Sequence, residues 1–172
     1  ANDPDDFVKA ETDWIGLALK DELPFLGICL GAQMLARHLG AKVGFHPEGH
    51  VEVGYYPLYP SEAACKELPW PDHVYQWHRE GFEVPSGAEL LATGDTFANQ
   101  AIRVGRCAYG IQFHPEVTHW MMNRWTTRAH ERMASPNARP RQDHFDGRYL
   151  YDPGVRLWLD AFLDHWTALK VA

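Results

Sequence analysis

Cys29 stands where two short sequence patterns with different structural meanings meet. Phe25 to Ile28 form a brief apolar run, typical of a strand buried on both faces, and residues 30–39 place apolar side chains at helical spacing before Gly40. A thiol on the turn between them would lie at a helix N-terminus, where the helix dipole and free N–H groups favour the thiolate. The pattern therefore indicates a cysteine nucleophile.

Two glycines flank Cys29 at the spacing of a nucleophile elbow. Gly27 and Gly31 lie two residues before and two residues after it. We expect both to supply small side chains where strand and helix crowd together, as in the G-x-nucleophile-x-G arrangement. The alternative is that Cys29 is only a small buried hydrophobe, which is the commonest fate of a free cysteine. The flanking glycines favour the nucleophile.

A histidine and a carboxylate that could serve this thiol follow a second strand pattern. Residues 101–104 and 107–113 predict paired strands around Gly105-Arg106, and the second strand ends in His114-Pro115-Glu116. The imidazole could take the thiol proton, and the carboxylate could fix the imidazole's orientation. The same triplet occurs at residues 46–48, and the better strand before His114 favours the later copy.

His46 and His50 are four residues apart with Glu48 between them. On a helix this spacing would suggest a metal site. Pro47 and Gly49 oppose a helix, so we expect a surface loop here and no metal ligands.

Composition limits the classes of function. The chain has 172 residues, of which 45% are hydrophobic, enough for one substantial core and a single domain. The formal net charge of −7 argues against nucleic acid or an anionic membrane as the main partner. The cysteine count of 3 is odd and no leader pattern is visible, so we expect a reducing compartment, by default the cytoplasm. The most apolar window, residues 23–36, is too short to span a bilayer.

The order of the expected elements indicates an α/β fold. A helix before Pro24, the strand at residues 25–28 and the helix after Cys29 follow the rhythm of a parallel sheet covered on both faces. Further extended segments are expected at residues 51–58, 74–78 and 89–93, and a closing amphipathic helix at residues 155–166 after a polar segment at residues 132–147. Cys65 lacks an elbow, and we expect it to pack inside.

The motifs at Cys29 and His114 together resemble those of the class I glutamine amidotransferases. The segment from Gly27 to Gln33 is similar to the family's cysteine motif, and the segment from Gly110 to Glu116 is similar to its histidine and glutamate motif. Val74-Tyr75-Gln76-Trp77-His78 resembles the strand that lines the glutamine pocket in GMP-synthetase-type amidotransferase domains. The resemblance covers the chain to about residue 120.

This resemblance implies a flavodoxin-like three-layer α/β sandwich with a mostly parallel central sheet, some antiparallel edge strands and a C-terminal helical extension. It assigns residues 1–122 to the amidotransferase domain and residues 123–172 to a helical extension packed on the same domain. Family members carry several strands and a glycine-rich loop ahead of the first helix, so we expect the sequence to be part of a longer chain.

The resemblance also implies a reaction. Cys29 would attack the side-chain amide of L-glutamine, His114 would move the proton, and Glu116 would orient the imidazole. A γ-glutamyl thioester would form and water would release glutamate. The Leu30 N–H would be one oxyanion donor, and the residues expected to hold the substrate are Gln33, Gln76, Trp77 and His78. No cofactor and no metal are implied.

A synthetase or other acceptor protein would be the partner that uses the ammonia, because no nucleotide-binding domain is recognisable in the sequence. Two other functions stay open. One is a hydrolase that uses the same three residues on another γ-glutamyl compound. The other is a non-catalytic binding or regulatory module that keeps the fold.

Overall fold

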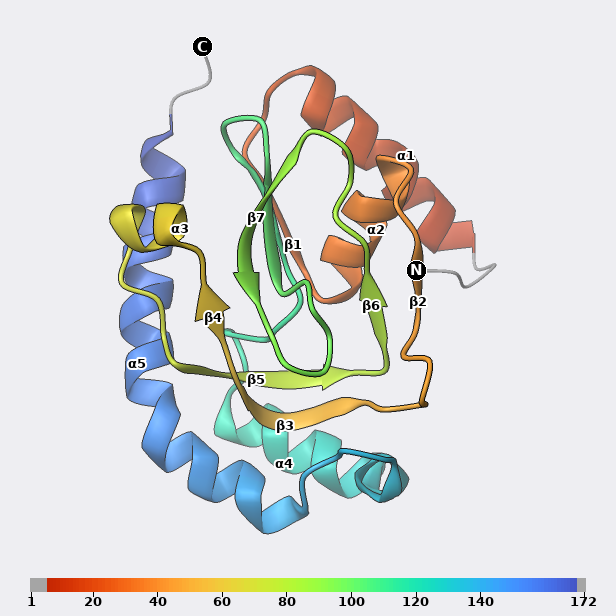
Figure 1. Ribbon diagram of the computed structural model, residues 1–172, viewed down its shortest axis with the longest axis vertical. Helices are drawn as coiled ribbons and strands as arrows, with labels where there is room; N and C mark the ends of the chain where they lie inside the picture. Colours follow the sequence, from red (N-terminus) through yellow and green to blue (C-terminus); the bar gives the residue numbers. More distant parts are fainter. Residues whose placement is uncertain (1–5, 170–172) are drawn as a thin grey trace.

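The computed structural model describes residues 6–169, and residues 1–5 and 170–172 lie outside the described part (Figure 1). The helices are α1 (Asp6–Lys20), α2 (Leu30–His38), α3 (Glu62–Glu67), α4 (His119–Arg128) and α5 (Arg141–Ala168), with a 3-10 helix η1 (His130–Ala134). The strands are β1 (Phe25–Ile28), β2 (Val43–Phe45), β3 (Glu52–Pro57), β4 (Tyr59–Pro60), β5 (His73–His78), β6 (Glu80–Phe82), β7 (Ala88–Thr93), β8 (Ala101–Val104) and β9 (Ala108–Ile111).

The main sheet has the strand order β1-β9-β8-β7-β4. Only β1 and β9 pair in parallel, and the other neighbours in this sheet are antiparallel. The pairs β2–β6 and β3–β5 are antiparallel as well. The prediction of a mostly parallel sheet is therefore wrong for the described strands. The reason is that short connections join β7, β8 and β9, and only a long crossover can return a chain in parallel. The predicted β8–β9 hairpin is confirmed.

Helices cover both faces of this sheet. Ile15 of α1 and Leu35 of α2 share a buried cluster with Phe25 and Ile102 on one side. Trp158 and Phe162 of α5 are buried against Tyr109, Ile111 and Leu91 in a second cluster. Figure 1 shows the strands lying between α1 and α2 on one side and α5 on the other. Burial of these apolar side chains fixes the sheet, and hence the ends of β1 and β9, between rigid helices.

The C-terminal helix is longer than the sequence pattern predicts. It begins at Arg141, whereas the sequence predicts a helix only at residues 155–166, so part of the polar segment at residues 132–147 is helical. Gly147 lets this part of the helix pack closely on β3, because a Cβ at this position would collide with the ring of Tyr55. Pro153 lies inside the helix and removes one backbone donor, but buried Val155 and Trp158 hold the following turns on the sheet.

All three cysteines are free. Cys65 is exposed, which corrects the expectation that it packs inside: α3 has six residues, and of these only Ala64 is buried. None of the helices between residues 6 and 169 combines the length and the apolarity needed to cross a bilayer.

Candidate active site

Cys29 occupies the sharp turn between β1 and α2, with backbone angles φ 50° and ψ −101°. A positive φ is strained for a residue with a side chain, and such residues persist only where their surroundings hold them. Two backbone hydrogen bonds do so. The Cys29 N–H donates to the Ile111 carbonyl at 2.8 Å, and the Gln33 N–H donates to the Cys29 carbonyl at 3.1 Å. This is the backbone of an elbow fixed between a strand pair and a helix.

The two flanking glycines do different things. A Cβ at Gly27 would lie 2.5 Å from the carbonyl carbon of Gly31, so only glycine lets the strand pass this close to the helix. A Cβ at Gly31 would meet nothing within 4 Å. The expectation of crowding is confirmed for Gly27 and wrong for Gly31.

His114 and Glu116 lie just beyond β9, beside Cys29. The His114 N–H donates to the Tyr75 carbonyl at 2.8 Å, which anchors the loop to β5. The His114 Nδ1 is 2.7 Å from Glu116 Oε1, and the Cys29 side chain lies near enough to the imidazole to raise its pKa. The edge of His114 meets the Trp125 ring of α4 at a centroid distance of 5.1 Å. The structure thus brings together the three residues that the sequence places in separate motifs.

Two opposing effects set the protonation of His114. Burial of the ring lowers its pKa, but hydrogen bonds and charges from Cys29 and Glu116 together outweigh burial and raise the pKa from 6.5 to about 9. The His114 side chain is 13% exposed and that of Glu116 is 38% exposed. The imidazole is therefore protonated at neutral pH and can act as a proton donor beside the sulfur.

Gln112 is a neighbour of the sulfur that no sequence pattern predicts. Its Nε2 lies 3.5 Å from Cys29 Sγ, and its Oε1 accepts from Gln33 Nε2 at 3.2 Å. Gln33 Nε2 also donates to the Glu80 carbonyl at 2.7 Å. The sequence does show a polar Gln112 between the apolar residues Ile111 and Phe113. Its contact with Cys29 could not be predicted from local spacing, because the two residues are 83 positions apart.

A buried polar network lies behind this amide pair. Glu52 Oε2 is 2.9 Å from His78 Nε2 and accepts from Gln100 Nε2 at 2.9 Å. His78 Nδ1 is bonded to the Glu80 carbonyl, and Gln76 Nε2 donates to Gln100 Oε1 at 2.7 Å. We call Glu52, His78, Gln76 and Gln100 the Glu52 network. Glu52 was missed because it stands between Val51 and Val53 at the start of β3, and Gln100 because it follows Asn99 in the loop before β8.

The residues expected to contact glutamine lie in and around this network. The side chains of Gln33, Gln76 and His78 are buried, while Trp77 is half-buried and packs against Trp125 at a centroid distance of 5.6 Å. Leu30 is the first residue of α2, where backbone N–H groups lack helical partners. Their roles toward a substrate and an oxyanion stay predictions.

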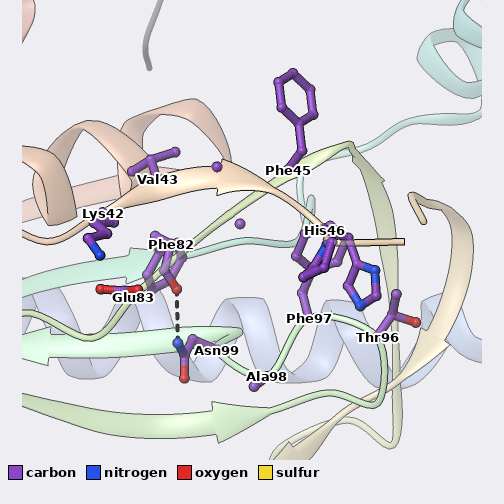
Figure 2. A pocket seen from close by; sticks show the side chains of 13 residues that line it. Lys42, Val43, Phe45, His46, Phe82, Glu83, Thr96, Phe97, Ala98 and Asn99 are labelled. Atoms are coloured by element: carbon purple, nitrogen blue, oxygen red, sulfur yellow. Dashed lines mark hydrogen bonds between the residues drawn. The ribbon is translucent and has the colours of Figure 1, made fainter. Parts of the chain in front are cut away.

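A cavity of about 370 Å³ opens between β2, β6 and residues 96–99. Figure 2 shows the side chains of His46 and Phe97 near each other among its lining residues, and the hydrogen bond from Asn99 Nδ2 to the Phe82 carbonyl at 2.9 Å. Neither Cys29, His114 nor Glu116 lines this cavity. The candidate site is therefore not inside this hollow.

A family model of the class I glutamine amidotransferases matches residues 2–128, a stretch that contains Cys29, His114 and Glu116. The chain belongs to the class I glutamine amidotransferase family. Among solved structures, a glutamine amidotransferase from Thermotoga maritima is 33% identical with a TM-score of 0.78, covering 93% of this chain and 69% of that one. A glutamine amidotransferase from Methylobacillus flagellatus, 24% identical with a TM-score of 0.89, shares the fold over 99% of this chain and 73% of its own.

Relatives of this amidotransferase chain include a subunit of the glutamine-hydrolyzing GMP synthase of Thermococcus kodakarensis. That protein is 35% identical over 99 residues, which are 56% of this chain and 53% of the relative. The corresponding GMP synthase subunit of Methanocaldococcus jannaschii is 34% identical over 107 residues, which are 61% of this chain and 57% of the relative. The chain thus spans about half the length of these curated relatives.

Proposed function

We propose that this chain is the glutaminase part of a glutamine amidotransferase and releases ammonia from L-glutamine through a cysteine γ-glutamyl thioester. The observation that carries the proposal is the position of His114, whose Nδ1 is 2.7 Å from Glu116 Oε1 and whose pKa is raised by the Cys29 side chain beside it. A nucleophile, a proton carrier and an orienting carboxylate are the parts that such a reaction needs. Membership of the amidotransferase family supports glutamine as the substrate.

In the first half of the reaction, the Cys29 sulfur, as a thiolate beside protonated His114, attacks the side-chain carbonyl carbon of glutamine. The Leu30 N–H, next to the sulfur at the start of α2, would donate to the oxygen that becomes negatively charged. His114 gives its proton to the amide nitrogen, the C–N bond breaks, and ammonia leaves. With a pKa of about 9, His114 holds this proton at neutral pH, and Glu116 keeps the ring aimed at the sulfur.

In the second half, water attacks the thioester carbonyl carbon while neutral His114 accepts a proton from it. The C–S bond then breaks, glutamate leaves, and the sulfur departs as a thiolate beside protonated His114, which is the pair that began the reaction. The sum is glutamine plus water giving glutamate plus ammonia, and these steps use no cofactor. Gln112 would hold the sulfur in place, because its Nε2 faces Sγ at 3.5 Å.

For the substrate, we propose that Gln33 and the backbone at Gln76 and Trp77 hold the amino-acid end of glutamine, with His78 as a second polar group near the pocket. The proximity of Gln33 to Cys29 through Gln112 supports the first of these assignments. The burial of Gln76 and His78 supports a contribution through main-chain groups, since their side-chain nitrogens already have protein partners.

For the assembly, the names of the two GMP synthase relatives, each a subunit of a larger enzyme, support a separate synthetase as the consumer of ammonia. We further propose residues 1–122 as the amidotransferase domain and residues 123–172 as its helical extension. A cytoplasmic location and the absence of nucleic-acid and membrane partners stay predictions.

The test is glutamate release from L-glutamine by the full chain, with L-asparagine as the control substrate. We expect release with glutamine and a loss of at least about a thousandfold in kcat/KM in Cys29→Ala. The matched control is Cys65→Ala, which removes an exposed thiol and leaves the rate unchanged. Glutamate release that survives Cys29→Ala would overturn the proposal.

A further inference from the structure

The loop between β2 and β3 holds three side chains with metal-binding atoms outside the candidate active site. A hydrogen bond from the Gly49 N–H to the His46 carbonyl at 2.9 Å closes a four-residue turn. Pro47 fixes the backbone at the second position, and Gly49 adopts φ +72° at the fourth. The turn reverses the chain, so that His46 and His50 stack with ring centroids 4.8 Å apart and an interplanar angle of 15°.

Glu48 completes the group. Its Oε2 is 3.7 Å from His50 Nδ1, and one ligand atom from each of His46, Glu48 and His50 lies within 4.8 Å of the other two. The sequence pattern predicts a loop without metal ligands. The loop is confirmed, and a turn brings the three donors together without the helix that their spacing would otherwise need.

The contacts of His46 leave one ring nitrogen for a metal. The Glu48 N–H donates to His46 Nδ1 at 3.2 Å, so Nδ1 is occupied and Nε2 is the nitrogen that can bind an ion. Metal binding at Nε2 would release the proton of that nitrogen. His50 and Glu48 have side chains 38% and 73% exposed, so an ion can reach them from solvent.

The donor set decides which ions fit. Two imidazoles and one carboxylate suit divalent first-row transition metals, whereas Ca²⁺ and Mg²⁺ prefer oxygen ligands. Tetrahedral Zn²⁺ with Zn–N bonds of about 2.0–2.1 Å needs donor atoms about 3.3 Å apart. The present spacing of up to 4.8 Å would close to this value by rotation of the exposed Glu48 side chain and the half-buried His46 and His50 rings, on a loop whose backbone turn is already formed.

We propose that the segment from His46 to His50 binds one divalent transition-metal ion, such as Zn²⁺, through His46, Glu48 and His50. Water or a donor from a bound molecule would complete the coordination. His46 also lines the 370 Å³ cavity and meets the edge of Phe97 at a centroid distance of 5.7 Å (Figure 2). The ion would therefore sit at the rim of a cavity and could hold an anionic group entering it.

The test is calorimetric titration of the untagged full chain with Zn²⁺, followed by Co²⁺ with visible absorption as the readout of coordination. Both titrations use a Cys29→Ser, Cys65→Ser background, because a thiolate would compete for these ions. We expect one equivalent to bind, at least a tenfold loss of affinity in His50→Ala or His46→Ala, and a smaller loss in Glu48→Gln.

The matched control is His130→Ala, which removes an exposed histidine that lies beside Glu131 on η1. Binding that His130→Ala leaves unchanged and His50→Ala weakens would support the proposal. No binding, or binding that His46→Ala and His50→Ala do not weaken, would overturn it. Because the readout is metal uptake, its failure is separate from any failure of the glutaminase reaction.

Discussion

Among the described residues, the pairs His78–Glu52 and His114–Glu116 both lie within hydrogen-bonding distance, at 2.9 Å and 2.7 Å, and they differ in the surroundings of the second ring nitrogen. His78 and Glu52 have side chains 2% and 1% exposed, and His78 uses its other nitrogen for the Glu80 carbonyl. His114 and Glu116 are 13% and 38% exposed, and the His114 ring also faces the Cys29 thiol. The same pair chemistry therefore serves a closed structural network in one place and an open site able to move a proton in the other.

Substituting each histidine should separate the two pairs most clearly. His114→Ala removes the proton carrier and should lower kcat/KM for glutamate release about a thousandfold, with a cost in unfolding free energy that disappears as the pH rises through about 9. His78→Ala should mainly lower the free energy of unfolding, because it leaves Glu52 buried without its imidazole partner. Glutamate release and urea unfolding of both variants check this. A large activity loss in His78→Ala with unchanged stability would contradict the comparison.

Substituting each glutamate should show the contrast in stability. Glu52→Ala breaks a buried pair and leaves His78 and Gln100 short of an acceptor, so it should cost about 3 kcal/mol or more of unfolding free energy. Glu116→Ala, at a partly exposed pair, should cost less than about 1 kcal/mol. Urea midpoints at constant slope measure both values. Similar losses of unfolding free energy in Glu52→Ala and Glu116→Ala would show that burial does not make the first pair more important for stability.

The pH dependence of the unfolding free energy should reveal the raised pKa of His114. Its folded pKa of about 9 lies above the ordinary value of 6.5, so its contribution is complete below pH 6.5 and disappears as the pH rises through about 9. The wild type should lose on the order of 2 kcal/mol relative to His114→Ala across this window. In NMR titrations, Glu116→Gln should lower the midpoint of the His114 ring resonance. A wild-type midpoint near 6.5 would contradict the geometry.

The smallest expected effects concern the β1–α2 turn that places Cys29 beside His114 and Glu116. Gly27→Ala places a Cβ 2.5 Å from the backbone of Gly31 and should cost about 2 kcal/mol of unfolding free energy. Gly31→Ala meets open space in the first turn of α2 and should be neutral or stabilise by up to about 1 kcal/mol. Thermal unfolding of the two variants measures the difference. Equal destabilisation would show that crowding is not confined to Gly27.

Local patterns in the sequence were enough to predict the turn at Cys29 and the hairpin before His114. They also favoured the later of the two His-Pro-Glu triplets, whose catalytic role stays a prediction. Each depends on a few consecutive residues and the turn chemistry between them. The direction of the sheet was not predictable in this way. A single helix-strand-helix segment suggested parallel pairing, but the short connections among β7, β8 and β9 set the direction of those strands.

Groups that depend on distant partners were missed for a related reason. Glu52 and His78 are 26 residues apart, and Gln112 and Cys29 are 83 residues apart, so no local spacing reveals these contacts. The start of α5 was missed because its first turns are polar, and contacts with Tyr55 and Tyr75 support a helix there that local sequence does not favour.

The most direct test of the central claim, that Cys29 with His114 forms a working site for glutamine, is covalent labelling with a glutamine-mimicking electrophile followed by intact mass and peptide mapping. We expect one adduct on Cys29, blocked by excess L-glutamine and slowed in His114→Ala. Labelling of Cys65 instead, or labelling of Cys29 that excess glutamine does not reduce, would contradict the claim.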